Sequence, residues 1–175
     1  MHSILKKLSG GTKRSLGRTN QLVAEILKNP KTFPHLIAGI SHHDPVIRMR
    51  AADAIEKITL QRPDLLRPFK KKLLALATGS AAPSLQQEVR WHLALLLPRL
   101  ELTLTERALA TDILFEYLDD RSIIVKTHAL QSLADLSASD PNLKPRMIPI
   151  LDATAQTGSP AQRARARKLL HQLSR

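Results

Sequence analysis

The 175-residue sequence predicts an all-α fold, in which about four helical pairs stack into a right-handed α–α superhelix, or solenoid. Three observations predict this class. Apolar residues recur at helical spacing, and no segment shows the alternation of a strand. Aromatic residues make up only 3% of the chain, which suits close helix packing better than a sheet sandwich. A helix-turn-helix pattern occurs four times, which indicates stacked units.

The clearest unit covers residues 36–58. Its turn contains Asp44 and Pro45, which predict the start of a helix because Asp caps free amides and Pro at the first helical position loses no hydrogen bond. The helix that follows has one apolar stripe, made of Ile47, Ala51, Ala54, Ile55 and Ile58. This spacing predicts a helix that is buried on one side.

The regions before this unit are less regular. We expect residues 1–19 to form a flexible basic tail, with an organelle transit peptide as the alternative because no acidic residue precedes Glu25. Residues 20–175 are expected to form a single helical repeat domain. Its first helix is short, capped by Thr19 or Asn20 and ended by Asn29 and Pro30.

Start and stop signals predict the remaining helices. One helix is expected over 63–78 and another over 122–136. Three capping boxes, which pair Ser or Thr with Glu or Gln three residues later, are Ser84 with Gln87, Thr103 with Glu106, and Ser159 with Gln162. They predict helices ending near Leu100, Leu118 and Leu173, and Asp140-Pro141 predicts one more start.

Aligning the second helix of each pair reveals the repeat. The aligned segments are IRMRAADAI from Ile47, VRWHLALLL from Val89, VKTHALQSL from Val125 and QRARARKLL from Gln162. Their starts are 42, 36 and 37 residues apart, close to the repeat length of two-helix solenoids.

These segments resemble HEAT repeats, in which an apolar-Arg-x-x-Ala motif opens the second helix after an Asp-containing turn. Ile47-Arg48-x-x-Ala51 after Asp44 matches best, and Val125-Lys126-x-x-Ala129 is next. Val89-Arg90-x-x-Leu93 departs at the small position, and Gln162 departs at the apolar position, as a terminal cap would. The resemblance covers about residues 33–173 and implies a HEAT-like superhelix.

Two basic columns emerge from the alignment. The first contains Arg48, Arg90, Lys126 and Arg163. The resemblance implies that this column forms a structural ladder with turn carboxylates, which here would be Asp44, Glu88, Asp119 or Asp120.

The second column contains Arg50, His92, His128 and Arg165. Since two residues along a helix are separated by about 200°, the two columns flank the buried stripe on opposite sides. We expect the second column, together with the lone Trp91, to bind a partner along the face lined by the second helices. The alternative is that it forms the outer edge of each helix.

The formal net charge is +12, concentrated in residues 1–30 and 144–175. Basic ends attract polyanions, although they also serve as solubilising caps of a repeat array. The preferred function is a non-enzymatic scaffold or adaptor that binds another protein or an acidic peptide. The alternative is a nucleic-acid-binding protein that uses the basic ends and groove.

Catalytic and metal-binding patterns are scarce. His42-His43-Asp44 has the composition of a metal site but no recognised ligand spacing. HEAT-like alkylpurine DNA glycosylases, a less favoured alternative, would need Trp91 and Asp53, and their motif is not matched. We expect no catalytic residues, metal or cofactor. The absence of cysteine and of a long apolar run indicates a cytoplasmic protein without a transmembrane segment.

Overall fold

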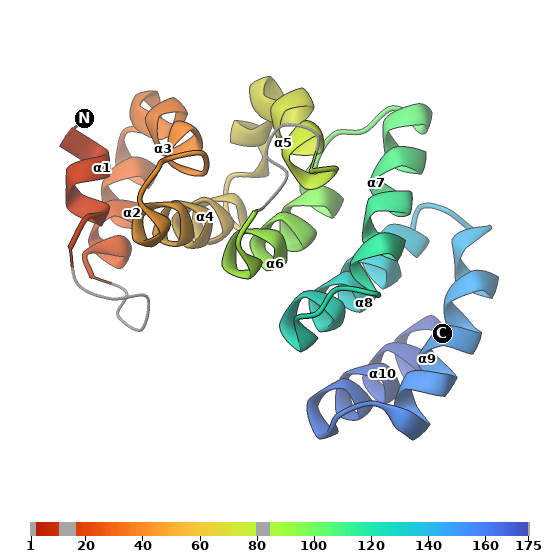
Figure 1. Ribbon diagram of the computed structural model, residues 1–175. Coiled ribbons are helices and arrows are strands. Elements are labelled where there is room, and N and C mark those ends of the chain that lie inside the picture. Colours follow the sequence, from red (N-terminus) through yellow and green to blue (C-terminus); the bar gives the residue numbers. More distant parts are fainter. Residues whose placement is uncertain (1–2, 11–16, 80–84, 175) are drawn as a thin grey trace. The chain divides into compact units, whose positions relative to one another are not determined.

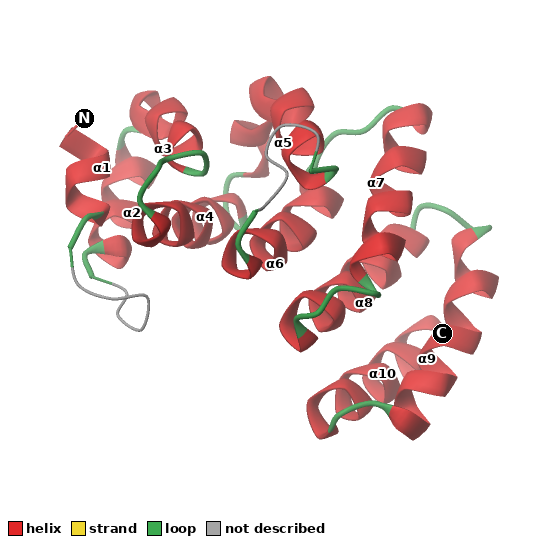
Figure 2. Cartoon of the chain, viewed as in Figure 1, coloured by secondary structure: helices red, strands yellow, loops and turns green. Residues whose placement is uncertain are grey.

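The computed structural model of the chain describes residues 3–10, 17–79 and 85–174. Within these residues every regular element is a helix and no strand occurs, which confirms the all-α class (Figure 2). The α-helices are α1 (Ser3–Leu8), α2 (Thr19–Lys28), α3 (Phe33–Gly39), α4 (Pro45–Thr59), α5 (Lys70–Ala77), α6 (Gln87–Leu96), α7 (Leu104–Tyr117), α8 (Ile123–Ser137), α9 (Leu143–Thr157) and α10 (Pro160–Leu173). Short 3-10 helices are η1 (Pro30–Thr32), η2 (Pro63–Phe69) and η3 (Leu97–Arg99).

The chain divides into two compact units, Met1–Glu101 (unit 1) and Leu102–Arg175 (unit 2). Each unit contains successive helical pairs, α3 with α4 and α5 with α6 in unit 1, and α7 with α8 and α9 with α10 in unit 2 (Figure 1). The sequence predicted one repeat domain over residues 20–175, whereas the packing separates this range after Glu101.

Helix α4 is the centre of unit 1 and packs against α1, α2, α3, η2 and α6. Its predicted stripe is confirmed: Ile47, Ala51, Ala54, Ile55 and Ile58 are each at most 1% exposed. The small side chains allow close approach, so that a methyl group added at Gly39 of α3 would lie 2.9 Å from the Ala51 Cβ. Burial of this stripe stabilises the packing of these five elements against α4.

Helices α4 and α6 are joined at both ends. At their N-terminal ends, the Arg48 Nη2 and Nε donate to the Gln86 Oε1 at 2.9 and 3.1 Å. At the C-terminal end of α4, Arg99 of η3, which directly follows α6, donates from its Nη1 to the Glu56 carbonyl at 2.7 Å, and its Nη2 lies 2.8 Å from the Glu56 carboxylate. The second helices of unit 1 therefore run parallel, side by side.

Unit 2 is built around α8, which packs against α7, α9 and α10. Val125, Ala129 and Leu133 are fully buried along its inner side. Leu114 of α7 and Leu169 of α10 are also fully buried, so each pair contributes apolar side chains to the unit.

The N-terminal segment differs from the predicted flexible tail. Ser3–Leu8 form α1, and Ile4, Leu5 and Leu8 are buried against α3 and α4. The sequence did not predict this six-residue helix, because its apolar residues span less than two helical turns and give too short a pattern. The part of the tail at 11–16 lies outside the described residues.

The helix starts follow the predicted capping signals in most places. The Asp44 Oδ1 accepts from the Val46 amide at 2.8 Å, and the boxes at Thr103 with Glu106 and Ser159 with Gln162 are both present. Ser84 lies outside the described residues, and α6 begins at Gln87 after Gln86.

Three predicted boundaries were wrong. Neither Thr19 nor Asn20 caps α2, whose N-cap is Arg18. Helix α9 starts at Leu143, because the Asp140 carboxylate accepts from the Asn142 amide in a turn that precedes the helix. The helix expected over 63–78 divides into η2 and α5, since Pro68 has no amide hydrogen for an α-helical bond.

Candidate functional site

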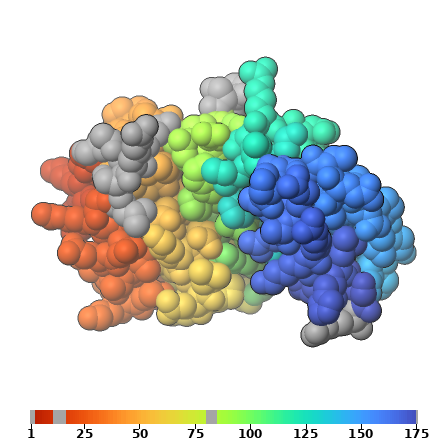
Figure 3. All heavy atoms as spheres, turned by 90° about the horizontal axis from the view of Figure 1, so that it is seen from below, coloured from red at the N-terminus to blue at the C-terminus, as the bar shows by residue number. Residues whose placement is uncertain are grey.

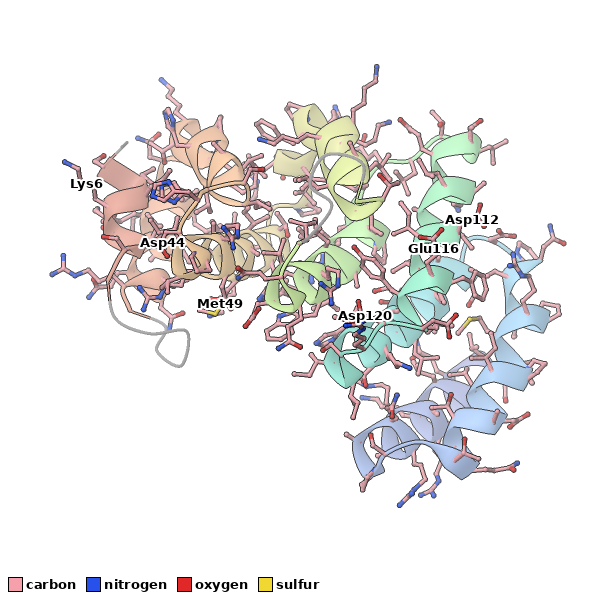
Figure 4. All side chains as sticks on the ribbon, in the orientation of Figure 1. Lys6, Asp44, Met49, Asp112, Glu116 and Asp120 are labelled. Atoms are coloured by element: carbon pink, nitrogen blue, oxygen red, sulfur yellow. The ribbon has the colours of Figure 1, made fainter. Side chains whose placement is uncertain are left out.

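Arginines of the first basic column donate hydrogen bonds to backbone carbonyls in the turns that precede the second helices. Arg48 lies four residues after the N-cap Asp44, and its Nη1 donates to the His43 and His42 carbonyls at 2.9 and 2.8 Å. Because helical side chains lean toward the N-terminus, a long guanidinium at this position reaches back over the turn. Figure 4 shows Asp44 where the chain enters α4.

Two further members make the same contact. Arg90 lies four residues after Gln86 and donates to the Leu85 carbonyl, and Arg163 lies four residues after Ser159 and donates to the Gly158 carbonyl at 3.0 Å. In each case the acceptor is the carbonyl just before the N-cap. The column is therefore a set of turn clamps.

The expected carboxylate ladder is wrong for Arg48 and Arg163. The acceptors of Arg48 are backbone carbonyls and the Gln86 amide, while Asp44 uses its carboxylate to cap α4. Arg163 likewise uses a carbonyl. The resemblance suggested the right position but the wrong acceptor, since carbonyls carry no sequence signal.

Lys126 is the member that differs. It lies four residues after the N-cap Ser122, yet within the part of the chain that the structure describes its ammonium makes no hydrogen bond or ion pair. A lysine lacks the forked donors with which an arginine clamps two groups at once. Its half-buried side chain instead lines a cleft of unit 2.

This cleft, named here the α8 cleft, has a volume of about 440 Å³. It is lined by Phe115, Leu118, Asp119, Lys126, Leu130, Ile150, Thr154 and Gln162. All four helices of unit 2 contribute. The walls are mainly apolar, with the Lys126 ammonium, the exposed Asp119 carboxylate and two neutral polar side chains among them. Such a lining suits a ligand that has an apolar group next to a charged group.

Arg50 of the second column does not offer its side chain to a partner. It is 1% exposed, and its Nη1 donates to the Leu8 and Gly10 carbonyls at 2.7 Å each and to the Ser9 carbonyl at 3.4 Å. These carbonyls lie at and just beyond the C-terminal end of α1, where a cation is favoured. The prediction failed here because α1 covers the side of α4 that was expected to be open.

The other members of the predicted binding face are dispersed. His92 is 8% exposed, and half-buried Trp91 lies beside it with ring centroids 5.7 Å apart. His128 is half-buried on α8. The Arg165 Nη1 donates to the Gln131 Oε1 at 2.6 Å, which joins α10 to α8. Buried Arg50 and His92 thus leave Trp91, His128 and Arg165 as the partly exposed members.

The His42-His43-Asp44 turn is a structural turn within unit 1. The two imidazole centroids lie 4.1 Å apart, and the Asp44 amide donates to the His42 Nδ1 at 3.1 Å. Desolvation, followed by the charge of His43, lowers the pKa of His42 below 6.5. No group of three or more His, Cys, Asp or Glu side chains in the described ranges could hold a metal ion.

Asp53, named with Trp91 for the glycosylase alternative, forms an ion pair with Lys57 at 2.8 Å. This bond joins consecutive turns of α4. Asp53 is thereby engaged in an interaction within its own helix.

Sequence reasoning missed most of the α8 cleft. Phe115, Leu130 and Ile150 have the ordinary apolar spacing of helices, and only the packing shows that they leave a hollow. One signal was present: Lys126 is the only lysine in a column of arginines.

Compared with the protein-family models and with the curated proteins, the chain matches none. Among the described residues, no helix combines the length and the apolar character needed to cross a bilayer.

Proposed function

We propose that this chain is a non-enzymatic scaffold of the HEAT-repeat type, which binds another protein through an acidic, partly apolar segment. The helical pairs form a right-handed superhelix in this proposal, and the second helices line the binding face. Support for stacked repeats comes from α4 and α6, which run parallel and are joined at both ends. The turn clamps at Arg48, Arg90 and Arg163 add a repeated structural device.

The α8 cleft is the observation that carries the binding proposal. Phe115, Leu130 and Ile150 provide apolar walls from three helices, and Lys126 provides an ammonium that no described group neutralises by an ion pair. Burial of one large apolar side chain contributes about 1.5–3 kcal/mol. A cleft between helices is a common place for such an anchor.

The charges of Lys126 and Asp119 indicate how many acidic residues the bound segment carries near its apolar anchor. A carboxylate next to the anchor would approach Lys126, whereas Asp119 on the same cleft would repel a second carboxylate. The expected ligand therefore carries one acidic residue close to a bulky apolar residue. Trp91, His128 and Arg165, which are partly exposed, remain candidates for contacts outside the cleft.

Nucleic-acid binding is the second candidate, favoured by the charge of unit 1. Residues 1–101 contain seventeen Lys and Arg against seven acidic residues, and residues 102–175 contain ten against eight. Unit 1 therefore carries +10 of the net +12. Such an excess attracts phosphate backbones and gives affinity that falls with salt.

The first experiment selects peptides from a random display library on the purified chain. We expect enrichment of peptides with Asp or Glu one or two residues from a large apolar residue. Synthetic copies should bind at least ten-fold more weakly to the Lys126→Glu variant, because the new carboxylate repels the acidic group. They should bind normally to Lys168→Glu, an exposed charge reversal outside the cleft lining.

Two results would reject the peptide proposal: a selection that enriches nothing, or peptides indifferent to Lys126. Fluorescence anisotropy with labelled single- and double-stranded DNA and RNA, from low to physiological salt, tests the alternative. Binding that persists at physiological salt and is insensitive to an excess of selected peptide would favour the nucleic-acid function.

A further inference from the structure

A second hollow lies in unit 1, where the ends of α1 and α2 meet α4. Its volume is about 380 Å³, and its described lining consists of Lys6, Lys7, Ser9, Gly10, Gly17, Arg18 and Arg50. No carboxylate belongs to this lining. The hollow, named here the α1 pocket, is thus bounded by cationic and small residues. In Figure 3 the atoms of α1 and α2, red to orange, lie side by side at the surface of unit 1.

The cations come from three separate parts of the chain. Lys6 and Lys7 lie in the last turn of α1, Arg18 is the N-cap residue of α2, and Arg50 lies on α4. Glu25 is the acidic group next to them, and its carboxylate pairs with the Lys7 Nζ at 2.5 Å. Lys6 and Arg18 are exposed, and Figure 4 shows the Lys6 side chain extending from α1. Among the described residues, no hydrogen bond or ion pair holds either side chain, so both are available to a bound anion.

Arg50 makes the wall of the pocket rigid. Its bonds to the Leu8 and Gly10 carbonyls fix the chain as it leaves α1. Gly17 lies close to the guanidinium: a methyl group added there would be 3.0 Å from the Arg50 Cζ, and the Gly17 φ of +54° is in the left-handed region. The Arg50 wall of the pocket is therefore fixed before any ligand binds.

The start of α2 adds a favourable field. The N-cap residue Arg18 makes no side-chain capping bond to this ten-residue helix, whose first turn has no acidic residue. Backbone amides and the helix dipole both favour a negative charge at such an end. Gly17 and Arg18, which immediately precede α2, are part of the pocket lining.

We propose that the α1 pocket binds the phosphate group of a small phosphorylated molecule. Multiple cations, a floor containing a guanidinium and the absence of a lining carboxylate favour a multiply charged oxyanion over a monocarboxylate. The lining comes from α1, from α4 and from the residues that follow α1 and precede α2, so the hollow suits a terminal phosphate better than the continuous backbone of a polymer. This site lies in unit 1 and is independent of the peptide cleft of unit 2.

Isothermal titration calorimetry with sodium pyrophosphate, at constant ionic strength, tests the proposal on the full chain. We expect saturable binding at one site per chain. The Lys6→Gln/Arg18→Gln variant should bind at least ten-fold more weakly. Lys71→Gln/Lys72→Gln, which removes the same charge from exposed positions of α5, should bind within two-fold of the original chain. Circular dichroism melting checks that both variants fold.

Equal weakening in the two double variants would overturn the proposal, because the effect would then come from net charge alone. A lack of saturable heat would also overturn it. Amide chemical shifts give an independent readout: pyrophosphate should move the Gly17, Arg18 and Thr19 signals, and shifts confined to other residues would contradict the assigned site.

The source of the phosphate is distinguished with two oligonucleotides that differ only in a 5′-phosphate. Tighter binding of the phosphorylated form, lost in the Lys6→Gln/Arg18→Gln variant, would identify a nucleotide terminus. Equal binding of both forms, together with no pyrophosphate binding, would overturn the small-phosphate proposal and assign the charge of unit 1 to polymer binding.

Discussion

Gly39 shows how a single residue determines the helix spacing in unit 1. A methyl group at this position would lie 2.9 Å from both the Ala51 Cβ of α4 and the Leu5 Cδ2 of α1. We expect Gly39→Leu to lower the free energy of unfolding by about 1–3 kcal/mol or more, because the contacting atoms belong to a packed core. Urea denaturation followed by circular dichroism measures the change.

Ala38→Leu is the matched control, since it adds bulk to the exposed neighbouring position of the same helix. It should change the free energy of unfolding by no more than about 0.5 kcal/mol. A Gly39→Leu variant as stable as this control would contradict the close approach of α1, α3 and α4.

His42 gives unit 1 a predicted dependence on pH. Desolvation first, then the charge of neighbouring His43, lower its pKa below 6.5 in the folded chain. The folded state therefore binds fewer protons than the unfolded state between the two pKa values. Stability is complete above pH 6.5 and declines as the pH falls toward the lower, folded pKa.

Protonation would also remove the lone pair of Nδ1 that accepts from the Asp44 amide. We expect His42→Gln to lose less stability than the original chain between pH 7.5 and pH 5. Urea denaturation at both pH values measures this difference. An imidazole titration by NMR that places the pKa of His42 above 6.5 would contradict the sign.

At the scale of the element, the turn clamps predict unequal effects within one aligned column. Arg163→Gln should lower the free energy of unfolding by about 1 kcal/mol, since it removes the donor to the Gly158 carbonyl. Lys126→Gln should leave stability nearly unchanged, because no hydrogen bond or ion pair among the described residues depends on its ammonium. Both variants are compared by thermal and urea denaturation.

Both changes affect unit 2, remove one positive charge and lie four residues after an N-cap, so each serves as the control for the other. Equal losses would mean that the charge, and not the carbonyl contact, is responsible. Lys126→Gln should instead lower the affinity of the chain for the peptides selected for the α8 cleft.

The elements also show what the sequence could predict. The α4 stripe and the caps at Asp44, Thr103 and Ser159 follow from local rules, in which a residue acts on its own helix. The role of Arg50 depends on α1, which lies about 40 residues earlier in the chain. Helical periodicity gives the direction of a side chain but not the neighbour that covers it.

The candidate sites depend even more on packing between elements. The walls of the α8 cleft come from four helices, and its apolar residues Phe115, Leu130 and Ile150 have the spacing of a normal apolar stripe. The α1 pocket needs Gly17 against Arg50, a contact between residues 33 positions apart. The basic composition predicted an anionic partner, but only the fold shows where several cations surround a hollow.

At the scale of the whole molecule, the division after Glu101 predicts two regions of separate stability. Each has its own core: Leu36 is fully buried in unit 1 and Leu114 in unit 2. Leu→Ala at such sites costs about 2–5 kcal/mol. We expect Leu36→Ala to reduce amide hydrogen-exchange protection mainly in residues 17–79, and Leu114→Ala mainly in residues 104–173.

The reciprocal design separates this expectation from general weakening of the chain. Native-state hydrogen exchange measures the opening free energy of each segment, and segments that unfold separately respond separately. If either variant lowered protection equally in both ranges, the chain would unfold as one cooperative body. If each acts on its own range, the peptide cleft and the phosphate pocket lie on regions that a ligand stabilises separately. Pyrophosphate would then raise protection in residues 17–79 and a cleft-binding peptide in residues 104–173, each through the free energy of its own binding.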